Sequence, residues 1–257
     1  MQDIHKEKDN RNIKIDYIGV DEVRLPISFK SKEVYNSIAS INSGVSLSEE
    51  EKGAHLSRIV EVFNDVLKDK PLTIKEMNSL LLVLSEKVEA DNVLVNIKFP
   101  IMIASKSPIS DKLSYVDTLI GLEAFKSQDS INKKIEVSIN GAMCCPSSKK
   151  ISKYGAHSQR CLLKVGLDGE IDNVKVEDVA KCMENSFSAP VSSIVKRVDE
   201  KYLTETAYEN PKFSEDLIRD TLLSLNAMYN NVGIEAESIN FESIHSHNVR
   251  AKGSINK

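Results

Sequence analysis

Long runs of alternating apolar and polar residues are the feature that most limits how this chain can fold. Alternation with a period of two gives a β-strand one buried face and one exposed face. Such runs occur at residues 13–29, 34–47, 93–104, 112–125, 131–142, 159–167 and 235–252. Pro26 and Pro100 interrupt two of them, and proline inside a strand is tolerated mainly at a sheet edge or a bulge. The sequence therefore predicts a protein rich in strands, with one or two edge-tolerant strands at 13–29.

Apolar residues at helical spacing mark four segments between these runs. The first opens at residues 52–58 and continues to Leu67, and the second runs from Thr73 to about Ala90. Thr73 and Glu76 have the spacing of a capping box, in which each side chain accepts from the other residue's backbone N–H. The other two helices are predicted at 176–187 and 213–229. The segment from 190 to 201, which ends in a charged run, has neither periodicity.

The order of these elements indicates the fold class. The first half reads strand-strand-helix-helix-strand-strand, and the second half again places helices between strands. This order predicts an α+β fold in which an antiparallel sheet has helices on one face. Residues 1–12 are mostly polar and charged, and they are predicted to form a flexible leader. The length of 257 residues allows one domain or two modules.

Several functional classes are excluded by composition and by motifs that are missing. The net charge of −4 argues against a general nucleic-acid binder, although a local group of cations can still hold one anionic ligand. There is no GxGxxG pattern and no Walker A pattern, so neither common phosphate loop is expected. No apolar run is long enough to span a bilayer, and the N-terminus lacks a signal-peptide core. We therefore expect a cytoplasmic protein whose four cysteines are reduced, with neither nucleic acid nor membrane as a partner.

The loop at 144–160 carries the first candidate site. Cys145 and His157, two soft metal ligands, lie in it with eleven residues between them. The loop also holds enough positive charge to bind an anion, from Lys149, Lys150, Lys153 and Arg160. These groups predict a metal site beside a phosphate site. The spacing matches no zinc-finger pattern, so a buried structural cysteine and an ordinary histidine are the alternative.

Two further segments carry candidate acid and base groups. Glu242 precedes His245 and His247 in the last strand run, where the two histidines share one face and Glu242 lies on the other. A bend at the strand end would bring all three into one pocket; incidental histidines on a solvated strand are the alternative. In the helix at 213–229, Glu215 falls on the apparent apolar side, where a bare charge is costly and proton transfer near neutral pH is favoured. An interaction with the helix dipole is the alternative there.

Taken together, these motifs resemble the prokaryotic type IB GTP cyclohydrolases and their archaeal relatives. The resemblance runs from about residue 4 to residue 248, and the motifs share the order and spacing of that family. The matching segments are Lys-Gly-Ala-His-Leu-Ser-Arg at 52–58, the loop at 145–160, Lys-Arg-Val-Asp-Glu-Lys at 196–201, 204–205, 207–208, 210–216, and Glu-Ser-Ile-His-Ser-His-Asn at 242–248.

The resemblance implies a tunnelling fold (T-fold) of two tandem modules, at 13–143 and 144–257, and a homotetramer with active sites between subunits. It also implies conversion of GTP and water to formate and 7,8-dihydroneopterin triphosphate, the first step toward folate-type pterins. Two alternatives stay open. One is the archaeal reaction, which ends in a 2',3'-cyclic phosphate, and the other is a T-fold protein that binds a purine or pterin without turnover.

The resemblance also assigns roles to single residues. Cys145, His157 and Glu200 look like the ligands of one catalytic divalent metal, with Zn²⁺, Mn²⁺ and Fe²⁺ all compatible. Glu215 resembles the acid-base carboxylate, His245 and His247 the histidines near the reacting ring, and Glu242 the carboxylate that binds guanine. Candidates for the triphosphate are chosen by charge, and they are Lys52, His55, Arg58, Lys149, Arg160 and Arg197. The family's usual Cys-Pro-Cys has Ser147 in place of its second cysteine here, so any role of that thiol is in doubt.

Overall fold

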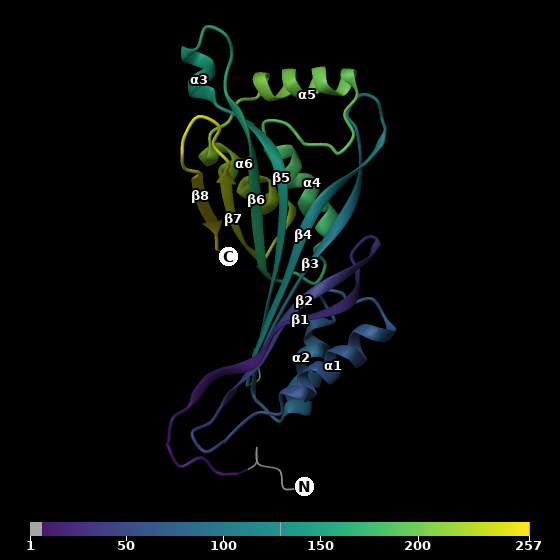
Figure 1. The fold of residues 1–257 in the computed structure, drawn as a ribbon, viewed down its shortest axis with the longest axis vertical. Helices are drawn as coiled ribbons and strands as arrows, with labels where there is room; N and C mark the ends of the chain where they lie inside the picture. The colour runs from purple at the N-terminus through teal and green to yellow at the C-terminus, as the bar shows by residue number, and fades with distance from the viewer. Residues whose placement is uncertain (1–6, 129, 257) are drawn as a thin grey trace. The chain divides into compact units, whose positions relative to one another are not determined.

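The computed structural model describes residues 7–128 and 130–256. Figure 1 shows the strands and helices that these residues form. In chain order they are β1 (Ile15–Lys30), β2 (Val34–Leu47), α1 (Leu56–Asp69), α2 (Met77–Val88), β3 (Asn92–Lys106), β4 (Leu113–Ser127), β5 (Ser130–Cys144), α3 (Pro146–Ile151), β6 (Ser158–Gly169), α4 (Val176–Ser186), α5 (Arg197–Glu209), α6 (Ser214–Met228), β7 (Val232–Asn240) and β8 (Val249–Ile255). The strands are hydrogen-bonded to one another in chain order, and the order of elements confirms the α+β class and the predicted first half.

The chain separates into two compact units. The first contains residues up to 100 together with 121–135 and 171–173, and the second contains 101–120, 136–170 and the chain from 174 onward. The boundaries fall inside β3, β4 and β5, so these long strands contribute to both units. The two modules at 13–143 and 144–257 remain a prediction. Residues 1–6 of the predicted leader lie outside the described residues, and Lys8 forms an isolated antiparallel bridge with Glu51.

In the first unit, the core forms between α1, α2 and the first two strands. α1 packs on β1 and on α2 (Figure 1). The helices bury Ile59, Val62, Phe63, Leu67, Met77, Leu80, Leu81, Leu84 and Val88, the residues that helical spacing selects. Thr73 and Glu76 do form the predicted capping box, since Thr73 N donates to Glu76 Oε2 at 3.0 Å and Glu76 N to Thr73 Oγ1 at 3.2 Å. The helix itself begins after a turn, at Met77.

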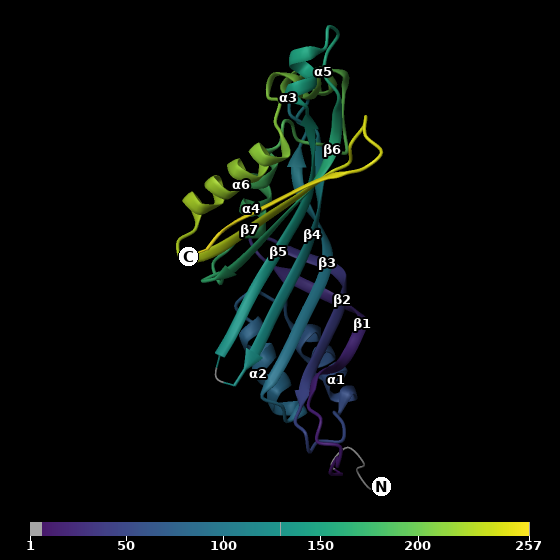
Figure 2. The ribbon, with the colours of Figure 1, turned by 90° about the vertical axis from the view of Figure 1, so that its left-hand side faces the viewer.

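In the second unit, α6 packs on β7 and β8, and α4 packs on α6. Figure 2 shows α6 running alongside β7. β7 has the strict alternation of a half-buried strand, with Val232, Ile234 and Ala236 facing the core. α6 approaches β8 closely at Gly253, where an added Cβ would lie 2.9 Å from Ile218 Cγ2. Among the described residues, no helix is both long enough and apolar enough to cross a membrane.

Three local predictions are wrong. The run at 235–252 forms two strands, β7 and β8, because residues 241–248 leave the sheet as a loop. The loop at 144–160 contains the short helix α3, which begins with Pro146 at its first position, where proline is favoured. The segment after residue 196 forms α5, a helix without a buried apolar stripe. Both helices and the loop lie close to predicted site residues.

Candidate active site

Ser148 forms hydrogen bonds with both ends of the segment from Cys145 to His157. Cys145 is the N-cap of α3, and its Sγ accepts a hydrogen bond from Ser148 N at 3.4 Å. His157 N donates to Ser148 Oγ at 3.2 Å, and Cys145 N donates to His157 O at 3.1 Å. The backbones of Cys145 and His157 are therefore joined, and both side chains are half-buried. The two predicted soft ligands lie side by side.

A hydrogen-bonded chain connects His157 to Glu242 through a residue that the sequence did not single out. His157 Nδ1 lies 2.9 Å from Gln159 Oε1, and Gln159 Nε2 donates to Glu242 Oε1 at 3.1 Å. Ser243 Oγ lies 3.4 Å from the same His157 nitrogen. The side chain of Gln159 thus connects the predicted metal ligand His157 to Glu242, the carboxylate predicted to bind guanine. No local sequence signal marks Gln159, because an amide at the start of a strand is common and its partner Glu242 is far away in the sequence.

The neighbouring cysteine lies in a different environment. Cys144 is buried and lines a cavity of about 400 Å³ together with residues of β6, of the 190–195 segment and of α5. Burial raises the pKa of the Cys144 thiol, with Lys149 opposing that effect. Cys145 does not line this cavity. The two adjacent thiols therefore do not share this cavity.

Glu200, the third predicted metal ligand, is exposed on α5. Of the residues of α5, all of which are described, only Asp199 is buried. Its carboxylate accepts from Ile109 N at 2.9 Å, from Ser110 N at 2.8 Å and Oγ at 2.6 Å, and from Lys196 N at 2.9 Å. Asp199 therefore fixes the start of α5 against the 107–112 turn, and this fixes the position of the neighbouring Glu200.

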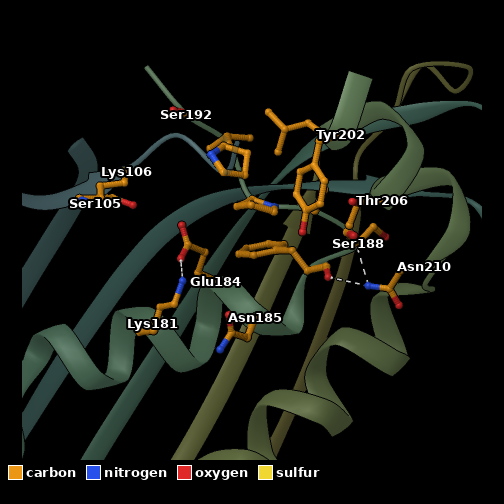
Figure 3. A pocket seen from close by; sticks show the side chains of 16 residues that line it. Ser105, Lys106, Lys181, Glu184, Asn185, Ser188, Ser192, Tyr202, Thr206 and Asn210 are labelled. Carbon is orange, nitrogen blue, oxygen red and sulfur yellow. Dashed lines mark hydrogen bonds and ion pairs between the residues drawn. The ribbon is translucent and has the colours of Figure 1, made fainter. Parts of the chain in front are cut away.

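The far end of α5 is anchored next to another cavity. Asn210 Nδ2 donates to the carbonyls of Phe187 and Ser188, as the dashed lines in Figure 3 show. This cavity, of about 320 Å³, is lined by Tyr202 and Thr206 of α5. Glu200 is not among its lining residues, and helical geometry turns it away from Tyr202 and Thr206. The cavity of Figure 3 contains none of the predicted site residues.

The buried carboxylate of Asp199 makes a testable contribution to stability. Burial alone would raise the pKa of Asp199, but hydrogen bonds from Ser110, Lys196 and Ile109 outweigh it and hold the pKa well below its usual range. A lowered folded-state pKa stabilises the protein above the unfolded pKa of about 4, and that contribution is lost as the pH falls. We expect Asp199→Asn to melt at a lower temperature than the parent protein at neutral pH. The difference should shrink below about pH 4.

Thermal unfolding followed by circular dichroism between about pH 3 and pH 8 measures this difference across the range where carboxylates titrate. Asp216→Asn is the matched control, because Asp216 occupies the same helix position in α6 but is only half-buried. Its Oδ2 accepts from Phe213 N at 3.0 Å. We expect it to have a smaller effect. An Asp199→Asn deficit that stays constant down to the lowest pH would contradict the assignment.

Glu215 does not lie where helical spacing places it. The buried side of α6 carries Ser214, Leu217, Ile218, Thr221, Leu222 and Leu225, whereas Glu215 is exposed in the first turn. The prediction of an apolar surround for Glu215 is wrong, because the first turn of α6 directs Ser214, and not Glu215, toward the core. The start of α6 is still tied to the site, since Asn240 Nδ2 donates to Ser214 Oγ at 2.5 Å. Asn240 ends β7 and is two residues from Glu242.

His245 and His247 lie in the loop between β7 and β8. Their rings stack with centroids 5.2 Å apart and an angle of 23° between the planes, and both side chains are exposed. The predicted common strand face does not exist, because residues 241–248 are not a strand. Glu242 instead turns to Gln159 and is half-buried. The bend therefore holds the three residues in one short loop, in which the two histidines stack on each other and Glu242 contacts Gln159.

The six cations predicted for the triphosphate fall in both units. Lys149 donates to the Tyr208 carbonyl and lies over the Tyr208 ring, 4.3 Å from its centroid. Arg160 and Arg197 are exposed. In the first unit, Lys52 forms an ion pair with Glu7, and Arg58 lies 3.0 Å from Glu89. His55 occupies the N-cap position of α1, where its side chain makes no capping hydrogen bond.

The predicted metal ligands fit a metal only in part. A cysteine sulfur and an imidazole whose Nδ1 is already hydrogen-bonded are a common pair of donors for a divalent transition metal. In residues 7–128 and 130–256, however, no three His, Cys, Asp or Glu side chains form a group that could hold a metal ion. Glu200 is therefore not grouped with Cys145 and His157 here. The three-ligand set stays a prediction.

Comparisons with known proteins bear on the identity of the chain. The sequence model of a family described as type I GTP cyclohydrolase folE2 matches residues 1–251. A GTP cyclohydrolase FolE2 from Fervidobacterium nodosum is 37% identical over 254 residues, which covers 98% of this chain and 96% of that protein. The GTP cyclohydrolase FolE2 of Dictyoglomus thermophilum is 38% identical over 264 residues, with 100% of both chains covered.

Among solved structures, uricase from Arthrobacter globiformis has a similar fold. Its TM-score is 0.56 at 9% sequence identity, and the match covers 95% of this chain and 94% of that one. Identity this low shows the fold alone. The fold and the site thus define an α+β protein with a thiol, an imidazole and a carboxylate gathered near the ends of β5, β6 and β7, groups typical of enzymes that act on small polar substrates. The sequence match is more specific: the chain belongs to the type I GTP cyclohydrolase folE2 family.

Proposed function

We propose that this protein is a metal-dependent GTP cyclohydrolase that converts GTP and water to formate and 7,8-dihydroneopterin triphosphate. The reaction is the first step toward folate-type pterins. The observation that carries the proposal is the joined group of Cys145, His157, Gln159 and Glu242, in a chain that matches GTP cyclohydrolases over its whole length. A thiol and an imidazole beside a carboxylate supply both metal donors and a group that can bind guanine.

Cys145, His157 and Glu200 would hold one divalent metal, and the donor set accepts Zn²⁺, Mn²⁺ or Fe²⁺. When bound, such a metal supplies an acidified water for attack on C8 of the guanine ring. Glu200 lies on α5, and the hydrogen bonds of Asp199 fix the start of that helix. The position of Glu200 relative to the other two ligands would therefore depend on the position of the whole helix. The four cysteines are free thiols, which leaves the Cys145 sulfur available as a metal donor.

Glu242 is proposed to bind the guanine edge by accepting from its N–H groups. Glu215, His245 and His247 are proposed to move protons to and from the opening ring. Glu215 is tied to the Glu242 segment by the Ser214–Asn240 hydrogen bond, which supports a shared role. The stacked and exposed histidines are accessible to a substrate that enters from solvent.

Lys52, His55, Arg58, Lys149, Arg160 and Arg197 are the proposed contacts of the triphosphate. Lys52 and Arg58 are paired with Glu7 and Glu89, so a phosphate would have to replace these carboxylates. Phosphate oxygens are strong acceptors for such charged donors, and the several negative charges of a triphosphate favour the exchange.

We further propose a tunnelling fold, which the likeness to uricase supports, and a homotetramer with active sites shared between subunits. Sedimentation should give a tetramer as the active species. An active monomer would contradict this assembly.

Turnover of GTP tests the proposed function directly. The protein is depleted of metal with a chelator, reloaded with Zn²⁺, Mn²⁺ or Fe²⁺, and incubated with GTP. We expect formate and 7,8-dihydroneopterin triphosphate in equal amounts, with no turnover before reloading. Chromatography separates the triphosphate from a 2',3'-cyclic phosphate, which would assign the archaeal reaction instead. If the protein binds GTP but releases no formate with any of the three metals, the proposal is wrong.

A further inference from the structure

The sheet places Gln159 opposite Glu242. β6 and β7 are antiparallel, and their register pairs Cys161 with Asn240. Beyond that pair, Phe241 N donates to Arg160 O at 3.0 Å. Continuing the register by one more residue on each side brings Gln159 opposite Glu242, the position of a direct cross-strand pair. The register of β6 and β7 thus brings the two side chains together, because the Phe241–Arg160 hydrogen bond extends that register one residue past the end of β7 into the loop that carries Glu242.

The chemistry of the groups sets the direction of each hydrogen bond. A carboxylate can only accept, so the side facing Glu242 must be the Gln159 amide NH₂. The amide oxygen then faces His157, and it can only accept. His157 Nδ1 must therefore be the donor. A neutral imidazole with its proton on Nδ1 has its free lone pair on Nε2.

We propose that Gln159 is a positioning residue that couples the metal-binding and guanine-binding halves of the site. This inference rests on the proposed function. Gln159 holds His157 in the tautomer that offers Nε2 to a metal, and it holds one oxygen of Glu242 so that the carboxylate keeps a fixed orientation toward guanine. All three side chains are half-buried, so each keeps part of its surface exposed.

Partners of this kind, which hold a ligand's second nitrogen, typically change metal affinity by tenfold to a hundredfold when they are removed. A residue that only filled space would be replaced by methionine without a loss in either affinity, since methionine has similar length and shape. A residue with two separate hydrogen-bonding tasks can also be changed so that one task is kept and the other is lost.

Two variants separate the tasks. Gln159→Met removes both hydrogen bonds, so it should weaken Zn²⁺ binding by about tenfold to a hundredfold and guanosine binding by about fivefold to tenfold. Gln159→Glu keeps an acceptor for His157 Nδ1 but places a second carboxylate against Glu242. It should bind Zn²⁺ at least as tightly as the parent protein while binding guanosine more weakly than Gln159→Met does.

The affinities are measured apart, on the full-length protein. Zn²⁺ affinity is taken without nucleotide, by competition with a chromophoric chelator. Guanosine affinity is taken by calorimetry on the metal-free protein, because guanosine lacks the phosphates that would bind metal. Ser243→Ala is the matched control, because Ser243 Oγ lies at the longer distance of 3.4 Å from the same His157 nitrogen. It should stay within about twofold of the parent protein for both ligands.

The outcomes distinguish this inference from the proposed function. If the parent protein binds neither Zn²⁺ nor guanosine, the proposed function itself is wrong. A parent protein that binds both, with a folded Gln159→Met that matches it in both, would overturn the role of Gln159 alone. Equal losses of both affinities in Gln159→Glu would also overturn it. Should Gln159→Met fail to fold, the split in Gln159→Glu between retained Zn²⁺ affinity and lost guanosine affinity still decides.

Discussion

Replacing Cys145 with alanine is expected to abolish metal binding and GTP turnover while leaving the protein folded. The backbone of Cys145 makes two backbone–backbone hydrogen bonds, from its own N–H to His157 O and from Lys149 N to its carbonyl, both at 3.1 Å. Alanine keeps both. The side chain contributes a weak cap to α3, and the loss of such a cap costs about 1 kcal/mol. The donor set, however, would lose its only thiolate, so metal affinity should fall by more than about a hundredfold.

The test compares metal content by mass spectrometry, formate release and thermal unfolding in parallel. Cys144→Ala is the matched control, because Cys144 is the adjacent thiol but is buried against the cavity near α5. It should lose some stability through the missing sulfur and keep its metal. Full turnover in a metal-free Cys145→Ala protein would rule out the proposed ligand.

The parts of the fold that follow from periodicity are those in which one face of an element is buried. α2 shows this well, since Met77, Leu80, Leu81, Leu84 and Val88 are both the predicted stripe and the buried residues of the helix. The order of strands and helices along the first half of the chain could be predicted for the same reason. A buried face produces a periodic pattern in the sequence because each position on it must be apolar.

α5 could not be predicted in this way. Its only buried residue is Asp199, whose burial is made possible by four hydrogen bonds that come from the 107–112 turn and from Lys196. Partners so far away in sequence leave no local pattern. The one local signal was the acidic residue three positions after Lys196, a common device at the start of a helix.

The candidate site shows the same division. Cys145 and His157 could be identified by residue type, and their backbones are joined in the structure. Gln159 could not, because an amide near the start of a strand is unremarkable until the register places it opposite Glu242. Glu215 was misplaced because its helical spacing puts it at the edge of the buried side of α6, and in the first turn Ser214 faces the core instead.

Glu215 and Glu242 are expected to fail in different ways when each is changed to glutamine. Glu242 is proposed to bind guanine, so Glu242→Gln should weaken GTP binding by about tenfold to a hundredfold, since it leaves donors of the base poorly paired. Its own bond to Gln159 can persist through the new amide oxygen. Turnover at saturating GTP should change much less. The measurement is steady-state kinetics at equal metal content, together with GTP affinity in the metal-free protein.

Glu215→Gln should instead lower kcat by about a hundredfold to ten-thousandfold with little change in GTP affinity, the range typical of a lost general acid or base. Because Glu215 is exposed at the N-terminus of α6, its charge could also act only through the helix dipole. Asp216→Asn separates the two readings, since it removes the neighbouring carboxylate of the same turn and should leave kcat within about threefold. Near-normal turnover in Glu215→Gln, or a loss explained by missing metal, would exclude Glu215 as the acid-base residue and leave proton transfer to His245 and His247.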